Sequence, residues 1–129
     1  AEPPMARILV AEDNAAVREF VERGLTHFGH TVVAVSDGGA ALHCLSLESY
    51  DLLITDIVMP VMDGIALALK ASSAAPDMPV LMMTGYAHER QRAYNLQELI
   101  ADVLDKPFSL EELTATVDRI LSGHRPAAS

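Results

Sequence analysis

Short aliphatic runs alternate with longer stretches of helical periodicity along this chain. Runs of roughly four to eight aliphatic or β-branched residues are typical of buried strands, whereas apolar residues three and four positions apart indicate amphipathic helices. The aliphatic runs predict strands near residues 7–11, 31–35, 51–55, 79–83 and 100–104. Strands that alternate with helices in this way are typical of βα units around a parallel sheet.

The stretches that follow these strands predict helices. Their expected positions are from Asn14 to Gly29, near 38–47, near 65–72, near 87–97, and from Ser109 onward. Asn14 is a favourable N-cap residue, and Ser109 followed by Glu112 matches the capping-box pattern. The segment at 87–97 has few apolar positions, so its helix is expected to be short and exposed.

Five βα units with right-handed crossovers make an α/β fold with a doubly wound parallel sheet. Ligands of such sheets lie at the carboxyl ends of the strands, beside the point where the strand order reverses. Glu12 and Asp13 follow the first strand, and Asp56 follows the third. We therefore expect these three carboxylates to meet in one crevice.

Composition and charge narrow the class of protein. The 129 residues suffice for one domain, which we place at 6–122 between flexible ends at 1–5 and 123–129. The chain shows neither a secretory leader nor the roughly 20 apolar residues of a membrane span, and Cys44 stands alone, so a cytoplasmic protein without membrane contact is expected. Nine basic against eighteen acidic residues give a net charge of -9, which opposes binding to nucleic acid.

The chemistry of the predicted crevice follows from its charge. Three carboxylates in one site repel one another unless a cation neutralises them, and ligands that are all oxygen atoms favour Mg²⁺. Thr84 stands at the end of the fourth aliphatic run, and Lys106 follows the fifth with a compact charge suited to a carboxylate or phosphoryl oxygen. Taken singly, each of these residues is more often a cap, a turn or a solvated side chain. Their coincidence at four strand ends favours a functional site.

Four pieces of sequence together resemble bacterial response-regulator receiver domains, the CheY-like family. They are Glu12-Asp13, Asp56 with Met59–Gly64, Thr84-Gly85-Tyr86, and Lys106-Pro107-Phe108. The resemblance covers nearly the whole chain and implies a flavodoxin-like sheet of five strands in the order 2-1-3-4-5, with helices on both faces. The stretches 84–87 and 105–109 are also similar to stand-alone alphaproteobacterial receivers, some of which act as adaptors in regulated proteolysis. We therefore expect a receiver with no effector domain in this chain.

The resemblance implies a role for each acidic residue. Asp56 would accept a phosphoryl group from the phosphohistidine of a histidine kinase or a histidine phosphotransfer protein. Asp13, Asp56 and the backbone carbonyl of Val58 would hold Mg²⁺, with Glu12 acting through water. The protein would then not be an enzyme in the usual sense, because it would catalyse only its own phosphorylation and dephosphorylation.

The resemblance also implies how the signal is read. Thr84 and Lys106 would contact the phosphoryl oxygens, and a cis peptide bond is implied between Lys106 and Pro107. The output would be altered contact with a downstream protein through the face formed by the fourth helix, the fifth strand and the fifth helix. Receivers usually carry an aromatic residue three positions before the lysine, where this chain has Val103. We expect residues 86–98 to reorganise without that aromatic side chain.

Three alternatives accompany this interpretation. The chain could be the receiver of a hybrid histidine kinase that relays the phosphoryl group onward. A Mg²⁺-dependent phosphohydrolase with an aspartate nucleophile has similar chemistry, but such enzymes usually carry a second aspartate where this chain has Val58. A degenerate receiver that only binds proteins would lack acceptor-site residues, and here all of them are present. Val58 also replaces the polar residue that often steers attacking water, so the lifetime of a phosphorylated form is left open.

Overall fold

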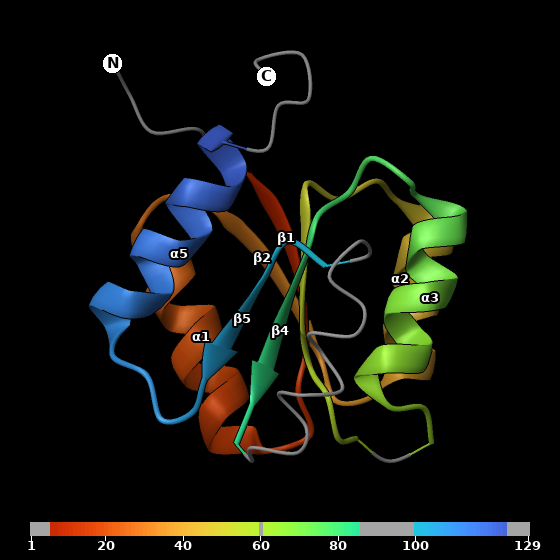
Figure 1. Ribbon diagram of the computed structural model, residues 1–129, viewed down its shortest axis with the longest axis horizontal. Helices are drawn as coiled ribbons and strands as arrows, with labels where there is room; N and C mark the ends of the chain where they lie inside the picture. The colour runs from red at the N-terminus through yellow and green to blue at the C-terminus, as the bar shows by residue number, and fades with distance from the viewer. Residues whose placement is uncertain (1–5, 60, 86–99, 124–129) are drawn as a thin grey trace.

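The computed structural model describes residues 6–59, 61–85 and 100–123 (Figure 1). Its strands are β1 (Arg7–Ala11), β2 (Thr31–Val35), β3 (Leu52–Asp56), β4 (Val80–Thr84) and β5 (Asp102–Asp105). The helices in this part of the chain are α1 (Ala15–His27), α2 (Gly38–Leu47), α3 (Gly64–Ala74) and α5 (Leu110–Gly123). The predicted helix at 87–97 and the predicted flexible ends at 1–5 and 123–129 lie outside the described residues, except for Gly123.

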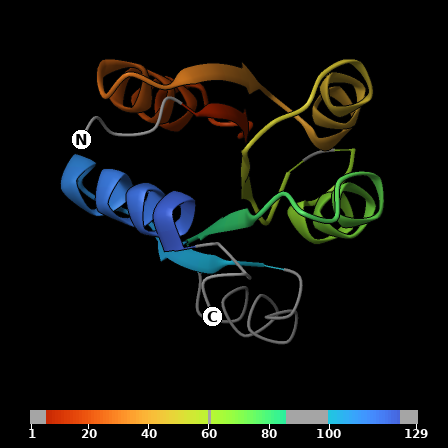
Figure 2. The same ribbon diagram turned by 90° about the horizontal axis from the view of Figure 1, so that it is seen from above.

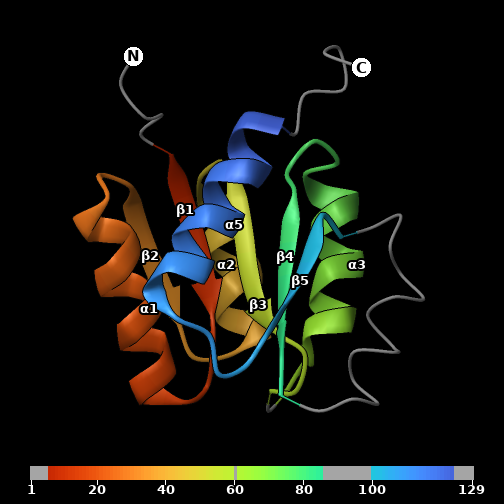
Figure 3. The ribbon, with the colours of Figure 1, turned by 60° about the vertical axis from the view of Figure 1, so that its left-hand side comes forward.

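All five strands pair in parallel in the order β2-β1-β3-β4-β5, which confirms the predicted doubly wound sheet. Helices α1 and α5 cover one face of the sheet, and α2 and α3 cover the other (Figure 2). The order reverses at β1, because β2 lies on one side of it and β3 on the other (Figure 3). The carboxyl ends of β1 and β3 therefore lie next to each other.

Side chains of successive strand residues enter two separate cores, as the two-residue period of a strand requires. In β1, Ile8 and Val10 pack with α1 and α5, whereas Leu9 and Ala11 pack with α2 and α3. Strands β3 and β4 are buried at every position, because both of their faces are covered. This explains why their sequences are continuous apolar runs without alternation.

The predicted helix ends are confirmed by their hydrogen bonds. The Asn14 side chain accepts the backbone N–H of Val17 at 3.1 Å, which caps α1. Gly29 follows α1 with a φ of 98°, a conformation that glycine adopts without steric cost. Ser109 and Glu112 form the reciprocal capping box, since each side chain accepts the other's backbone N–H, at 2.9 and 3.0 Å. These local bonds set where each helix begins or ends.

Several element bounds differ from the prediction by one or two residues. Strands β3 and β4 start and end one residue late, and β5 begins two residues late. The cause in β3 is that Asp56 still pairs with Met83 of β4, so a carboxylate occupies the last ladder position. The aliphatic pattern placed the strand end before this polar residue. Helix α5 reaches Gly123, one residue past the predicted end of the domain.

His30 is a buried titratable group between α1 and β2, with 5% of its surface exposed. Its Nδ1 accepts a hydrogen bond from the backbone N–H of Ala6 at 3.2 Å, so protonation of this nitrogen would break the bond. Burial lowers the pKa of His30, and the Asp118 carboxylate opposes this effect. The folded chain therefore favours the neutral imidazole.

We expect the free energy of unfolding to fall as the pH drops below about 6.5, the ordinary pKa of histidine. Between that value and the lower pKa of the folded state, the unfolded chain binds more protons, so stability rises with pH. The contribution of His30 has a limiting slope of about 1.4 kcal/mol per pH unit. Urea unfolding of the native chain and of His30→Asn measures it, because an amide oxygen can still accept from Ala6 and does not titrate. Identical pH profiles for the two proteins would contradict the prediction.

Candidate functional site

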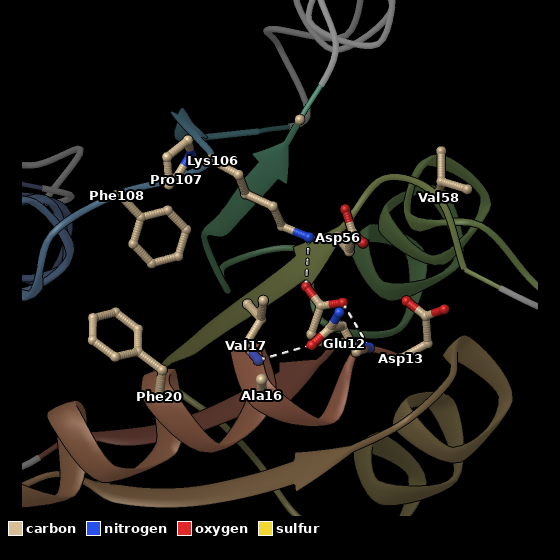
Figure 4. Close-up of a pocket in the computed structure, with 12 residues that line it drawn as sticks. Glu12, Asp13, Ala16, Val17, Phe20, Asp56, Val58, Lys106, Pro107 and Phe108 are labelled. Atoms are coloured by element: carbon tan, nitrogen blue, oxygen red, sulfur yellow. Dashed lines mark hydrogen bonds and ion pairs between the residues drawn. The ribbon is translucent and has the colours of Figure 1, made fainter.

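Side chains from three strand ends meet at the carboxyl edge of the sheet (Figure 4). Glu12 and Asp13 directly follow β1, Asp56 is the last residue of β3, and Lys106 directly follows β5. They line a pocket of about 690 Å³. The structure thus confirms that the three predicted carboxylates and the lysine come together. This placement follows from the strand order, which sets β3 between β1 and β4.

Glu12 is fully buried and is held at several of its atoms. Its backbone N–H donates to the carbonyl of Val35 at 3.0 Å, which continues the pairing of β1 with β2. Oε2 accepts the backbone N–H of Asn14 at 3.0 Å, and Oε1 lies 2.8 Å from Nζ of Lys106. Burial raises the pKa of Glu12 and the nearby Asp56 carboxylate raises it further, although Lys106 and the Asn14 N–H oppose them. The carboxylate is therefore costly to hold without a cation.

The Asp56 carboxylate has a fixed orientation. Oδ1 accepts the backbone N–H of Ile57 at 2.9 Å, and Oδ2 lies 3.1 Å from Nζ of Lys106. The residue is 7% exposed, so it is close to solvent but largely enclosed. An ionised carboxylate in this position can act as a metal ligand or as a nucleophile toward a group that enters the pocket.

Lys106 bridges the acidic residues of two strands. Its backbone N–H donates to the carbonyl of Thr84 at 2.8 Å, which anchors the loop after β5 to the end of β4. The peptide bond between Lys106 and Pro107 is cis, as the resemblance implied. Burial lowers the pKa of Lys106, but its interactions with Glu12 and Asp56 raise it more, so the pKa stands above its ordinary value. The ammonium group therefore keeps its proton.

The donor atoms of this site suit a hard divalent cation. Glu12, Asp13 and Asp56 can each offer a carboxylate oxygen such that these atoms lie within 4.8 Å of one another. Lys106 supplies one positive charge beside three carboxyl groups, so the site has room for a further cation. Ligands that are all oxygen atoms favour Mg²⁺ over softer metals. The residues present thus fit a magnesium ion.

A model of the response regulator receiver domain family matches residues 8–118 of this chain. The chain belongs to this family. Response regulator receiver protein CpdR of Brucella abortus is 38% identical over 117 residues, which cover 91% of this chain and 98% of CpdR. Response regulator MprA of Mycobacterium ulcerans is 37% identical over 115 residues, which cover 89% of this chain and 50% of MprA. This receiver thus spans half the length of some of its curated relatives.

Solved structures agree with this assignment. The chemotaxis response regulator CheY4 of Vibrio cholerae superposes with a TM-score of 0.84 at 29% identity, over 92% of this chain and all of CheY4. The predicted CheY-like, flavodoxin-like fold is therefore confirmed. Receivers of this family act in two-component signalling, where they interact with histidine kinases and downstream effectors. They generally bind Mg²⁺ at an acidic pocket, and they are not enzymes in the usual sense.

The two other predicted site residues, Val58 and Thr84, differ from each other in exposure and in their relation to the pocket. The Val58 side chain lies at the pocket and is 51% exposed. Thr84 ends β4 and is 1% exposed, and Gly85, not Thr84, lines the pocket. The assignments of the Val58 carbonyl to the metal and of the Thr84 hydroxyl to a phosphoryl group stay predictions.

Among the described residues, no helix is long and apolar enough to cross a bilayer.

The structure adds an aromatic wall that the sequence did not reveal. Phe20 of α1 is 40% exposed and lines the receiver pocket. Its ring centroid lies 6.1 Å from that of Phe108, which follows the cis peptide bond. Phe20 lies on the same helix as the core residues Val21 and Leu25 and is apolar like them. Only the position of the loop after β5 distinguishes it from them.

Proposed function

We propose that this receiver is a switch controlled by phosphorylation of Asp56. The observation that carries the proposal is the position of the Asp56 carboxylate, which faces Lys106 and lies beside two further acids at the carboxyl edge of the sheet. The phosphoryl donor would be a histidine kinase or a histidine phosphotransfer protein. The recipient of the signal would be a downstream protein whose contact with the receiver changes.

In the proposed transfer, a carboxylate oxygen of Asp56 attacks the phosphorus atom of a phosphohistidine. A P–O bond to Asp56 forms while the P–N bond breaks, and the released imidazole nitrogen takes a proton from solvent. The hydrogen bond from the Ile57 N–H to Oδ1 restricts rotation of the carboxylate before the donor arrives. Such positioning, together with charge stabilisation, accounts for most of the rate in phosphoryl transfer.

The negative charge of the phosphoryl group must be offset by other groups in the pocket during the transfer. The transferred group brings negative charge into a pocket that already holds three carboxylates. Lys106 is protonated and can pair with a phosphoryl oxygen. We propose that Asp13, Asp56 and the Val58 carbonyl hold Mg²⁺, with Glu12 acting through water. When bound there, the ion would offset negative charge on the phosphoryl oxygens.

Thr84 and the strand beside it are the proposed route to the output face. The hydrogen bond from the Lys106 N–H to the Thr84 carbonyl ties the end of β4 to the loop after β5. A phosphoryl group that draws the Thr84 hydroxyl toward it would therefore favour a different arrangement of β5 and its flanks. Val103 on β5 is partly buried against the core on the side of the sheet that carries α2 and α3, so a shift of β5 would change its packing. Phosphorylation would shift a population that already exists in the free protein.

Incubation with acetyl phosphate tests the proposed acceptor chemistry. We expect the intact mass to increase by one phosphoryl group when Mg²⁺ is present and not when a chelator removes it. The gain should stop at one group per chain, because the proposal assigns the acceptor role to Asp56 alone. Absence of any mass gain with Mg²⁺ and excess donor would overturn the proposed function.

Three further assays on the purified chain separate the alternatives. Continued release of inorganic phosphate over many turnovers from a phosphomonoester would indicate a phosphohydrolase. Rapid loss of the group to a histidine phosphotransfer protein, without any phosphorylation-dependent partner, would indicate a relay receiver. A stable phosphorylated form that captures a downstream protein supports the switch.

A further inference from the structure

Arg18 of α1 folds back onto the loop that carries the acidic pair. Its Nη1 donates to the backbone carbonyl of Glu12 at 2.8 Å and lies 3.5 Å from the carbonyl of Asp13. Among the described residues, no carboxylate forms an ion pair with Arg18. The guanidinium of this half-buried residue is thus used to hold two consecutive backbone carbonyls. Hydrogen bonds from a charged donor are stronger than those between neutral groups.

The two acids depend on this contact to different degrees. Glu12 is fixed by several bonds, since its N–H binds the Val35 carbonyl and its carboxylate contacts Asn14 and Lys106. Asp13 is exposed, and its carboxylate has no hydrogen bond or ion pair within the part of the chain that the structure describes. The place of the Asp13 side chain is therefore set by its backbone, which Arg18 constrains.

We propose that Arg18 is a positioning residue for the cation site, which presents the Asp13 carboxylate toward Glu12 and Asp56 by binding the carbonyls of the loop after β1. This inference rests on the proposed function, because it concerns the same site. The positioning role and simple electrostatics predict opposite effects of removing Arg18 on the affinity for Mg²⁺. A positive charge near the site repels Mg²⁺. If Arg18 acted only through its charge, its removal would therefore strengthen Mg²⁺ binding. Removal of a positioning residue weakens binding.

Titration of the protein with Mg²⁺ alone, followed through backbone amide NMR shifts, measures this difference directly. We expect Arg18→Met to weaken Mg²⁺ binding by about 10-fold, the lower end of what loss of a group supporting metal ligands costs. Arg23→Met is the matched control. It removes the same charge from the same helix, but Arg23 is 83% exposed and pairs only at 3.9 Å with Glu19 in the described residues. Its affinity for Mg²⁺ should match that of the native chain.

Arg18→Lys separates charge from geometry and guards against misfolding of the methionine variant. Lysine keeps the charge, but both contacts come from Nη1 of a rigid planar guanidinium, and a compact ammonium on a flexible stem should hold the two carbonyls less rigidly. We expect this variant to bind Mg²⁺ more weakly than the native chain does. For both variants, the Mg²⁺ concentration at half-maximal phosphorylation by acetyl phosphate should rise, while the rate at saturating Mg²⁺ stays unchanged.

The outcomes are distinct. Unchanged or stronger Mg²⁺ binding in a folded Arg18→Met or Arg18→Lys protein overturns the role of Arg18 and leaves the proposed function intact. A lower phosphorylation rate at saturating Mg²⁺, with unchanged affinity, also overturns it, because the residue would then act on transfer and not on the cation. If the amide NMR shifts of the native chain do not change when Mg²⁺ is added, the metal site itself is overturned, and the role of Arg18 with it.

Discussion

Asp56→Asn is expected to abolish phosphorylation by acetyl phosphate. An amide is a far weaker nucleophile than a carboxylate. Glu12, the other carboxylate that pairs with Lys106, is fully buried and accepts the Asn14 N–H, so it should not replace Asp56. The fold should persist, because the Asn side chain retains an oxygen that can accept the N–H of Ile57. Intact mass after incubation with donor and Mg²⁺ provides the measurement. The native chain should gain one phosphoryl group and the variant none.

A matched control tests whether the loss of phosphorylation in Asp56→Asn comes from the site and not from the change of net charge. Asp118→Asn removes one negative charge from the exposed surface of α5, away from the pocket, and should be phosphorylated like the native chain. The Asp56 variant should also have a lower pKa for Glu12, because the Asp56 carboxylate is one of the causes that raise it. A variant that takes up phosphate at the native rate would show that the acceptor lies elsewhere.

Much of this site could be predicted from sequence because its residues stand at strand ends. Apolar runs mark buried parallel strands, and the first polar residues after each run must lie at the carboxyl edge of the sheet. Glu12, Asp13, Asp56 and Lys106 were predicted in this way, and the structure brings all four into one pocket. The pattern and the handedness of the crossovers predicted a doubly wound sheet, whereas the order β2-β1-β3-β4-β5 was implied by the family resemblance.

Other features depend on contacts that the local pattern does not encode. The ion pair of Lys106 with Asp56 joins residues 50 positions apart, and its existence needs both strand ends in place. Phe20 has the spacing of a core residue, yet it faces the loop after β5. The role of Arg18 was equally hidden, because its partners are backbone carbonyls, which every residue has.

Gly64 is a residue whose importance the sequence showed only through the family resemblance, as the end of the Met59–Gly64 piece. In the structure it is the first residue of α3. A Cβ built on Gly64 would lie 2.0 Å from the backbone oxygen of Asp56 and 3.0 Å from Cα of Ile57. Glycine is thus required here because the start of α3 packs against the backbone of Asp56.

Gly64→Ala should therefore destabilise the fold strongly. Helix propensity alone predicts the opposite, since alanine is favoured over glycine in helices by about 1 kcal/mol. The contact is with backbone, which can yield only if β3 or α3 shifts, so we expect a loss of about 3 kcal/mol, at the upper end of what overpacking usually costs. Phosphorylation of Asp56 should also slow, because the shift displaces its carboxylate. Urea unfolding and the acetyl phosphate assay measure the two effects.

Gly123→Ala is the control that isolates the steric cause. Gly123 ends α5, and a Cβ there meets nothing within 4 Å among the described atoms. Both substitutions add one methyl group at a helix terminus, so propensity predicts nearly the same small change for each. The steric argument predicts a stable Gly123→Ala protein and an unstable Gly64→Ala protein. Equal stability of the two would mean that the close approach of α3 to Asp56 imposes no constraint on β3.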